Sequence, residues 1–104
     1  MEEKKSLFKD VFIPIEIPIE NHKGDEFVIK TKFRTVKEDI ELEKLSRAVN
    51  NPKNDEKTIN EKAIEMLIIL CGETFDFWKQ FSSKMLTQIS KYIFEKELED
   101  TKKK

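Results

Sequence analysis

At 104 residues and 38% hydrophobic content, the chain has the length of one domain and enough apolar residues for one modest core. Its 20 basic and 21 acidic side chains leave a net charge of -1, which argues against the clustered positive face of a nucleic-acid binder and gives no reason to expect an anionic membrane as target. We therefore predict one domain over residues 1–104, with no nucleic acid and no membrane among its partners.

The two ends are charged enough to predict disorder in residues 1–6 and 100–104. No apolar stretch that could act as a signal peptide follows the first five residues, Met-Glu-Glu-Lys-Lys. The longest apolar run, residues 64–71, is far shorter than the roughly 20 residues that cross a bilayer. The single cysteine, Cys71, is compatible with a reducing compartment. We expect a cytoplasmic location.

The first folded segment has the period of a β-hairpin. Apolar residues occupy the odd positions of residues 11–19, while Pro14 and Pro18 fall on the polar side, where they cannot donate to a strand ladder. Residues 21–25 contain Gly24 and supply the turn, and a second alternating run follows it. We predict a hairpin over residues 10–34 whose first strand lies at an edge or is only partly paired.

Three helices are predicted after the hairpin, over about residues 36–50, 58–71 and 74–99. The first two begin with capping boxes, Thr-x-x-Glu, starting at Thr35 and Thr58. Gly72 is predicted to end the second helix, and Thr74 to cap the third. The fold class is therefore α+β: an N-terminal β-hairpin followed by three α-helices, with a mainly helical core.

The last predicted helix is unusually aromatic, because residues 74–98 hold six of the chain's ten aromatic side chains. At 100° per residue its apolar side chains cover about half the circumference, wider than the roughly 100° stripe of an ordinary surface helix. Two interpretations stay open: this face is the core of a small domain, or it is an interface for self-association or a helical partner. The residues assigned to this core or interface are Phe75, Phe77, Trp78, Phe81, Met85, Ile89 and Tyr92.

No catalytic, metal-binding or cofactor-binding residues are predicted. His22 is the only histidine and falls in an exposed turn, so a nucleophile–histidine pair would need a distant partner. One cysteine and one histidine give no zinc-ligand spacing, and Gly24 and Gly72 form no phosphate-binding loop. The chain is expected not to be an enzyme and to need no cofactor.

The segments follow one another in a recognisable order. An Ile/Pro/Glu-rich strand is followed by a turn with Gly-Asp-Glu-Phe, then by a second strand ending Lys-Phe-Arg-Thr and running into Val-Lys-Glu-Asp-Ile-Glu-Leu-Glu-Lys-Leu. This order resembles that of the tail assembly chaperones of long-tailed bacteriophages. In that family, a small α+β domain often begins with a hairpin whose second strand runs into a helix with a similar x-Thr-x-x-Glu junction. The resemblance covers about residues 10–98.

This resemblance implies a phage or prophage protein that acts without catalysis, coats the tape-measure protein during tail assembly and is absent from the finished virion. Its implied partners are the tape-measure or another phage structural protein and further copies of itself, and it can have a longer frameshifted form. Two alternatives stay open. One is a small phage or host interaction protein, such as an inhibitor or adaptor. The other is a helix-turn-helix DNA-binding regulator around Gly72.

Overall fold

The computed structural model describes the backbone of residues 7–102 and the side chains of residues 7–99. Of the segments predicted to be disordered, residues 1–6 and 103–104 lie outside the described residues. Residues 100–102, which were also predicted to be disordered, continue the last helix beyond its predicted end at residue 99.

The N-terminal hairpin is confirmed, although its strands are shorter than the predicted span of residues 10–34. Strand β1 covers Glu16–Glu20 and strand β2 covers Glu26–Lys30, and they pair antiparallel with Pro18 opposite Val28. Side chains alternate between the two faces of a strand, so one face of the hairpin collects the apolar residues. The buried members of that face are Ile17, Ile19 and Ile29.

Asn21 shapes the turn between the strands. Its Oδ1 accepts hydrogen bonds from the backbone N–H groups of Lys23 and Asp25, each at 2.9 Å. Gly24 has φ 90, a conformation that glycine adopts without steric cost. The Asn21 Nδ2 also donates to Gln80 Oε1 at 2.8 Å, so the turn is tied to a segment 59 residues further along the chain.

Helix α1, Val36–Val49, begins where the sequence predicts. The Thr35 hydroxyl accepts a hydrogen bond from the Glu38 N–H at 3.3 Å, and the Thr35 N–H donates to the Glu38 carboxylate at 3.1 Å. Both halves of the capping box are therefore present.

Helix α2, Glu56–Cys71, begins two residues earlier than predicted. The prediction of Thr58 as its N-cap is wrong: Asp55 is the N-cap, and its Oδ1 accepts the Thr58 N–H at 2.8 Å. Aspartate caps a helix at least as well as threonine, so the earlier residue starts the helix. The helix ends at Gly72, as predicted, with φ 83.

The single helix predicted over residues 74–99 is wrong, because the chain breaks there into two helices. Helix α3 covers Phe75–Lys79, with Thr74 as the predicted N-cap, and helix α4 covers Ser83–Lys102. The Ser82 hydroxyl accepts the Met85 N–H at 3.1 Å, which satisfies a free amide at the start of α4. By accepting a backbone N–H with its side chain, Ser82 favours the start of a new helix over continuation of the previous one. The apolar stripe runs through this break without interruption, so the stripe alone predicted one helix.

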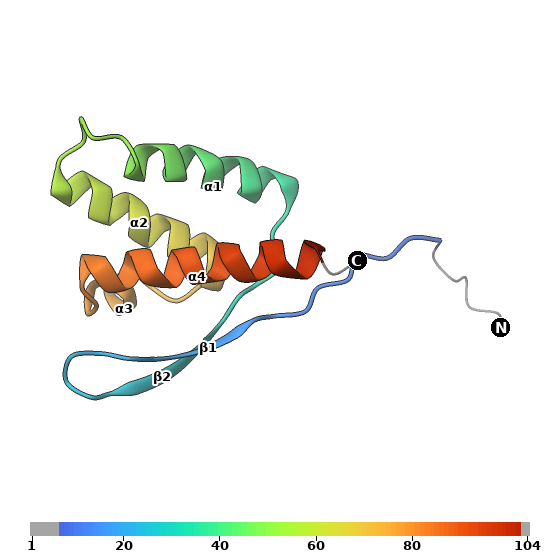
Figure 1. Ribbon diagram of the computed structural model, residues 1–104, viewed down its shortest axis with the longest axis horizontal. Coiled ribbons are helices and arrows are strands. Elements are labelled where there is room, and N and C mark those ends of the chain that lie inside the picture. The colour runs from blue at the N-terminus through green and yellow to red at the C-terminus, as the bar shows by residue number, and fades with distance from the viewer. Residues whose placement is uncertain (1–6, 103–104) are drawn as a thin grey trace.

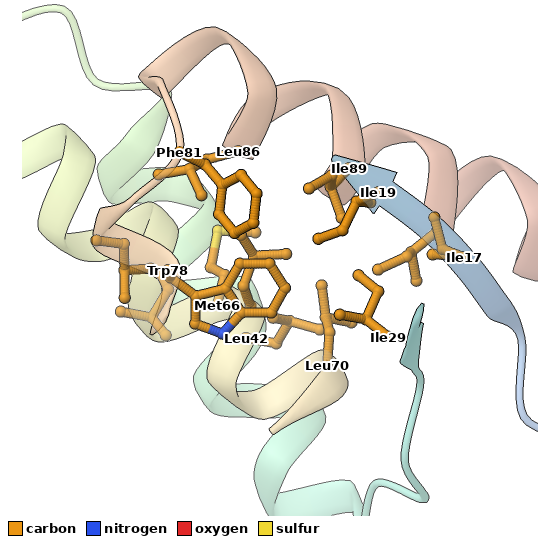
Figure 2. Close-up of a cluster of buried hydrophobic side chains, with 14 residues drawn as sticks. Ile17, Ile19, Ile29, Leu42, Met66, Leu70, Trp78, Phe81, Leu86 and Ile89 are labelled. Atoms are coloured by element: carbon orange, nitrogen blue, oxygen red, sulfur yellow. The ribbon is translucent and has the colours of Figure 1, made fainter. Parts of the chain in front are cut away.

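Helices α1 and α2 pack side by side, α4 crosses in front of α2, and the hairpin lies below the helices in this view (Figure 1). This arrangement confirms an α+β fold with an N-terminal hairpin followed by helices. The core lies where the apolar face of the hairpin meets α2, α3 and α4, and Figure 2 shows the hairpin isoleucines directed toward the side chains of these helices. The side chains with the least exposure, at 0%, are Leu67, Leu70, Trp78 and Ile93.

The carboxylates that cap α1 and α2 predict a loss of stability in acid. Hydrogen bonds from the Thr35 backbone lower the pKa of Glu38, and hydrogen bonds from the Thr58 side chain and backbone lower the pKa of Asp55. A lowered folded-state pKa stabilises the fold above the unfolded-state value, and this stabilisation disappears as pH falls through the folded-state value. We expect the unfolding free energy to fall between about pH 5 and pH 3, as measured by urea titration.

The matched control for this pH effect is Asp55→Asn, because asparagine keeps a capping oxygen and does not titrate. The variant should show a shallower decline across the same pH range. An identical decline in both proteins would contradict the assignment of Asp55 as a titrating cap.

Candidate interaction surface

The seven residues assigned from sequence to a core or an interface separate into three groups. Trp78, Phe81 and Ile89 are buried, with 0%, 8% and 4% of their surface exposed. Phe77 and Met85 are partly buried and pack against the core. Phe75 and Tyr92 are exposed, at 38% and 42%. Within the monomer the greater part of this aromatic segment is therefore core, and its exposed aromatic members are Phe75, Tyr92 and Phe94.

An aromatic cluster joins the hairpin to α3. Phe27 of β2 lies edge-on to Phe77, with ring centroids 5.2 Å apart, and edge-on to Phe81 at 6.2 Å. Edge-to-face pairs at these separations stabilise beyond their buried area. The Trp78 indole N–H donates to the Gly72 carbonyl at 2.9 Å, so the buried ring has its one polar atom satisfied. The short α3 thus delivers aromatic rings that cover the inner face of the hairpin.

A groove runs between the first half of α2 and the corner where α3 passes into α4. It contains two neighbouring hollows, of about 520 and 490 Å³, that share Glu56, Asn60 and Ser83 in their walls. We call this feature the α2/α4 groove. The apolar residues that line it are Ile59, Ile64, Phe75, Phe81 and Leu86.

Charged side chains border the α2/α4 groove on both sides. The α2 side carries Glu56, Lys57 and Glu61, and the opposite side carries Lys79 from α3 and Lys84 from α4. The groove therefore combines an apolar interior with a rim that carries both positive and negative charges. The acidic residues of this rim all belong to α2. This pattern suits the burial of an amphipathic segment whose polar edge carries matching charges.

Sequence reasoning missed most of this groove. Of the seven residues assigned to the aromatic segment, Phe75 and Phe81 line it, but Ile64 and Leu86 were not selected. The missing signal was the helix break after Gln80, because only that break turns α4 back beside the start of α2 (Figure 1).

A second exposed apolar feature precedes β1. Residues 7–13, which we call the N-terminal strap, extend away from the body of the domain (Figure 1). Phe12 is the exception, because its ring is 39% exposed and lies edge-on to Phe33 with centroids 6.2 Å apart. The exposed fractions are 92% for Leu7, 90% for Phe8, 79% for Val11 and 80% for Ile13. The sequence held a signal for this feature, because three successive apolar residues at 11–13 cannot all face one side of a strand.

The least exposed arginine and the cysteine have no features of a reactive site. Arg34 binds both Asp39 of α1 and Glu97 of α4. Burial raises the pKa of the Cys71 thiol to about 12, which leaves almost no thiolate near neutral pH. His22 is exposed in the hairpin turn, as predicted. Among the described residues, no group of three or more His, Cys, Asp or Glu side chains is arranged to hold a metal ion. None of the helices found in that part of the chain is long and apolar enough to cross a membrane.

Comparisons with models of protein families, with curated proteins and with solved structures found no match for this chain.

Proposed function

We propose that this chain is a non-enzymatic assembly factor of the kind that the tail assembly chaperones of long-tailed bacteriophages represent. In this proposal it binds the tape-measure protein in the host cytoplasm and associates with further copies of itself. The observation that carries the proposal is the α2/α4 groove, with Phe75 on its wall at 38% exposure above the buried Ile64 and Leu86. The resemblance in residues 10–98 supplies the choice of partner.

A helical segment is the occupant that fits this groove. Its apolar interior lies between two helices, and grooves of that kind bind the apolar face of an amphipathic helix. The acidic residues on one rim and Lys79 and Lys84 on the other favour a helix with basic residues along one polar edge and acidic residues along the other. A tape-measure protein is long and rich in helix, so it offers many such segments.

The variant Phe75→Glu tests the groove. We expect it to weaken binding to the tape-measure protein encoded by the same phage by about tenfold or more, because a charge replaces an apolar anchor at the contact. Isothermal titration calorimetry gives the dissociation constants. Far-UV circular dichroism of the variant should match that of the wild type, since Phe75 is partly exposed in the unbound protein.

Tyr92→Glu is the matched control, because Tyr92 is an aromatic residue of similar exposure, 42%, that does not line the groove. It should bind as the wild type does. A tape-measure protein that does not bind the wild type removes the proposal. Equal effects of the two substitutions would remove the groove as the binding site.

The helix-turn-helix alternative receives no support from the helix that follows Gly72. Helix α3 has five residues and its Trp78 is fully buried, whereas a recognition helix must present side chains to the major groove of DNA.

A further inference from the structure

One edge of the hairpin is available for an additional strand. The Thr31 N–H donates to the Ile15 carbonyl and the Asn21 N–H to the Asp25 carbonyl, each at 3.0 Å. The backbone N–H and C=O groups of the odd-numbered residues therefore point toward the partner strand of the hairpin. The N–H and C=O groups of even-numbered residues therefore point away from it. On β2 these residues are Glu26, Val28 and Lys30, which have no backbone partner within residues 7–102.

The two edges of the hairpin are not equivalent. The outer row of β1 consists of Pro14, Glu16, Pro18 and Glu20, in which the prolines have no N–H to donate. The outer row of β2 has an N–H at every position. Beyond Lys30 this row is already used, since the Lys32 N–H donates to the Leu70 carbonyl at 2.9 Å. An added strand can therefore pair with residues 26–30 of β2 and with nothing beyond them on that edge.

The N-terminal strap fits this edge in one antiparallel register. Placing Phe12 opposite Val28 exchanges the contact of the Phe12 ring with Phe33 for a contact with Val28 on the outer face. It also sets Asp10 opposite Lys30, which have opposite charges. The same register sets the inward side chains of the strap over the apolar face of β2. Those inward pairs are Val11 with Ile29 and Ile13 with Phe27.

The strap cannot reach this edge within its own molecule. It continues in line from β1, and only residues 14 and 15 join it to the paired part of that strand. Two extended residues span at most about 7 Å. To lie beside Phe27 of its own molecule, Ile13 would have to move roughly 10 Å sideways, across both strands, and roughly 13 Å along the hairpin. The strap on any β2 edge must come from another copy.

We infer that copies of this chain associate head to tail by strand addition, in which residues 10–13 of one copy pair antiparallel with residues 27–30 of the next. Pro14 has no N–H to donate, so the pairing ends before it. The strap continues in line from β1 and its inward side chains lie on the inward face of β2, so neighbouring copies are related by a shift along the sheet and not by a two-fold axis. Each copy therefore gives its strap to one neighbour and offers its β2 edge to another. This inference rests on the self-association in the proposed function and assigns that self-association to the hairpin, away from the α2/α4 groove. The two surfaces can therefore be tested separately.

Disulfide trapping tests the register. In a Cys71→Ala background, an Asp10→Cys chain is mixed with an isotope-labelled Lys30→Cys chain and oxidised gently, so that a mixed disulfide reports contact between copies. We expect roughly tenfold more mixed disulfide than with a labelled Glu16→Cys chain, because opposed residues lie within the reach of a disulfide and Glu16 lies one strand further away. The comparison is matched, since Lys30 and Glu16 side chains are both 62% exposed.

The dissociation constant of self-association tests the edge itself. Val28→Lys should weaken self-association by about tenfold in analytical ultracentrifugation, since every paired β2 edge carries the change and lysine protects strand edges. Val36→Lys is the control, because Val36 is a similarly exposed valine, at 75% against 61%, on α1. A wild type that stays monomeric at all concentrations, or equal results for the matched variants in either experiment, would overturn the inference.

The two proposals fail in different ways. Val28→Lys should still bind the tape-measure protein, and Phe75→Glu should still self-associate. Loss of strand pairing alone would leave the groove intact as the partner site.

Discussion

Replacing Trp78 with alanine should destabilise the domain by about 3–5 kcal/mol, the largest effect we expect from any single substitution here. Trp78 is fully buried between the hairpin and α2, and its removal opens a cavity in the core. It also leaves the Gly72 carbonyl without the indole donor that lies 2.9 Å away. Domains of this size have about 5–15 kcal/mol of total stability, so a large part of it would be lost.

Urea unfolding followed by far-UV circular dichroism measures this loss, because the variant has no other tryptophan for fluorescence. Tyr92→Ala is the control, since its ring is 42% exposed and its loss should change the unfolding free energy by less than about 1 kcal/mol. A Trp78→Ala protein as stable as the Tyr92→Ala protein would show that the aromatic segment is not the core.

Replacing Arg34 with methionine should cost about 1.5–3 kcal/mol, the second largest effect. Its Nη1 and Nη2 bind the two oxygens of Glu97 at 3.0 and 2.9 Å, and its Nε binds Asp39 at 2.8 Å. The Arg34 side chain is only 15% exposed, so these charge-assisted bonds are less screened than those of a surface pair. Arg34 therefore holds the start of α1 against the end of α4.

The pKa of Arg34 is raised, chiefly by its hydrogen bonds to Glu97. A raised folded-state pKa gives stability that is present at every pH below the unfolded-state pKa. The unfolded-state pKa of arginine already lies above the accessible pH range, so the titration of Arg34 removes none of this stability there. Arg47→Met is the matched control, because Arg47 pairs with Glu43 on the surface, where both side chains are more than half exposed. It should cost less than about 0.5 kcal/mol in the same urea measurement, and equal costs for the two variants would contradict the bridging role of Arg34.

Local signals in the sequence predicted much of this fold. The alternation of residues 11–19, the capping box at Thr35 and the end at Gly72 each depend on neighbouring residues, so they could be recognised without knowledge of the tertiary structure. The errors arose where two local signals competed. Asp55 replaced Thr58 as a cap, and Ser82 began a new helix inside a continuous apolar stripe.

The candidate site could be predicted only in part. Whether Trp78 and Phe81 are core or interface depends on what covers them, and the cover is Phe27 and its neighbours in a hairpin about 50 residues earlier. The α2/α4 groove depends on the angle at which α4 leaves α3, which no short sequence window encodes. Phe75 was selected correctly as an apolar residue, but its position on a groove wall is a tertiary property.

The most direct test of the proposed role is amide hydrogen exchange of this protein with and without the tape-measure protein, followed by mass spectrometry. A helix bound in the α2/α4 groove should slow exchange in residues 56–64 and 83–88, which line it, and leave the β2 edge at residues 26–30 unchanged. Binding that slows exchange only outside residues 56–64 and 83–88, or the absence of binding, would contradict the account.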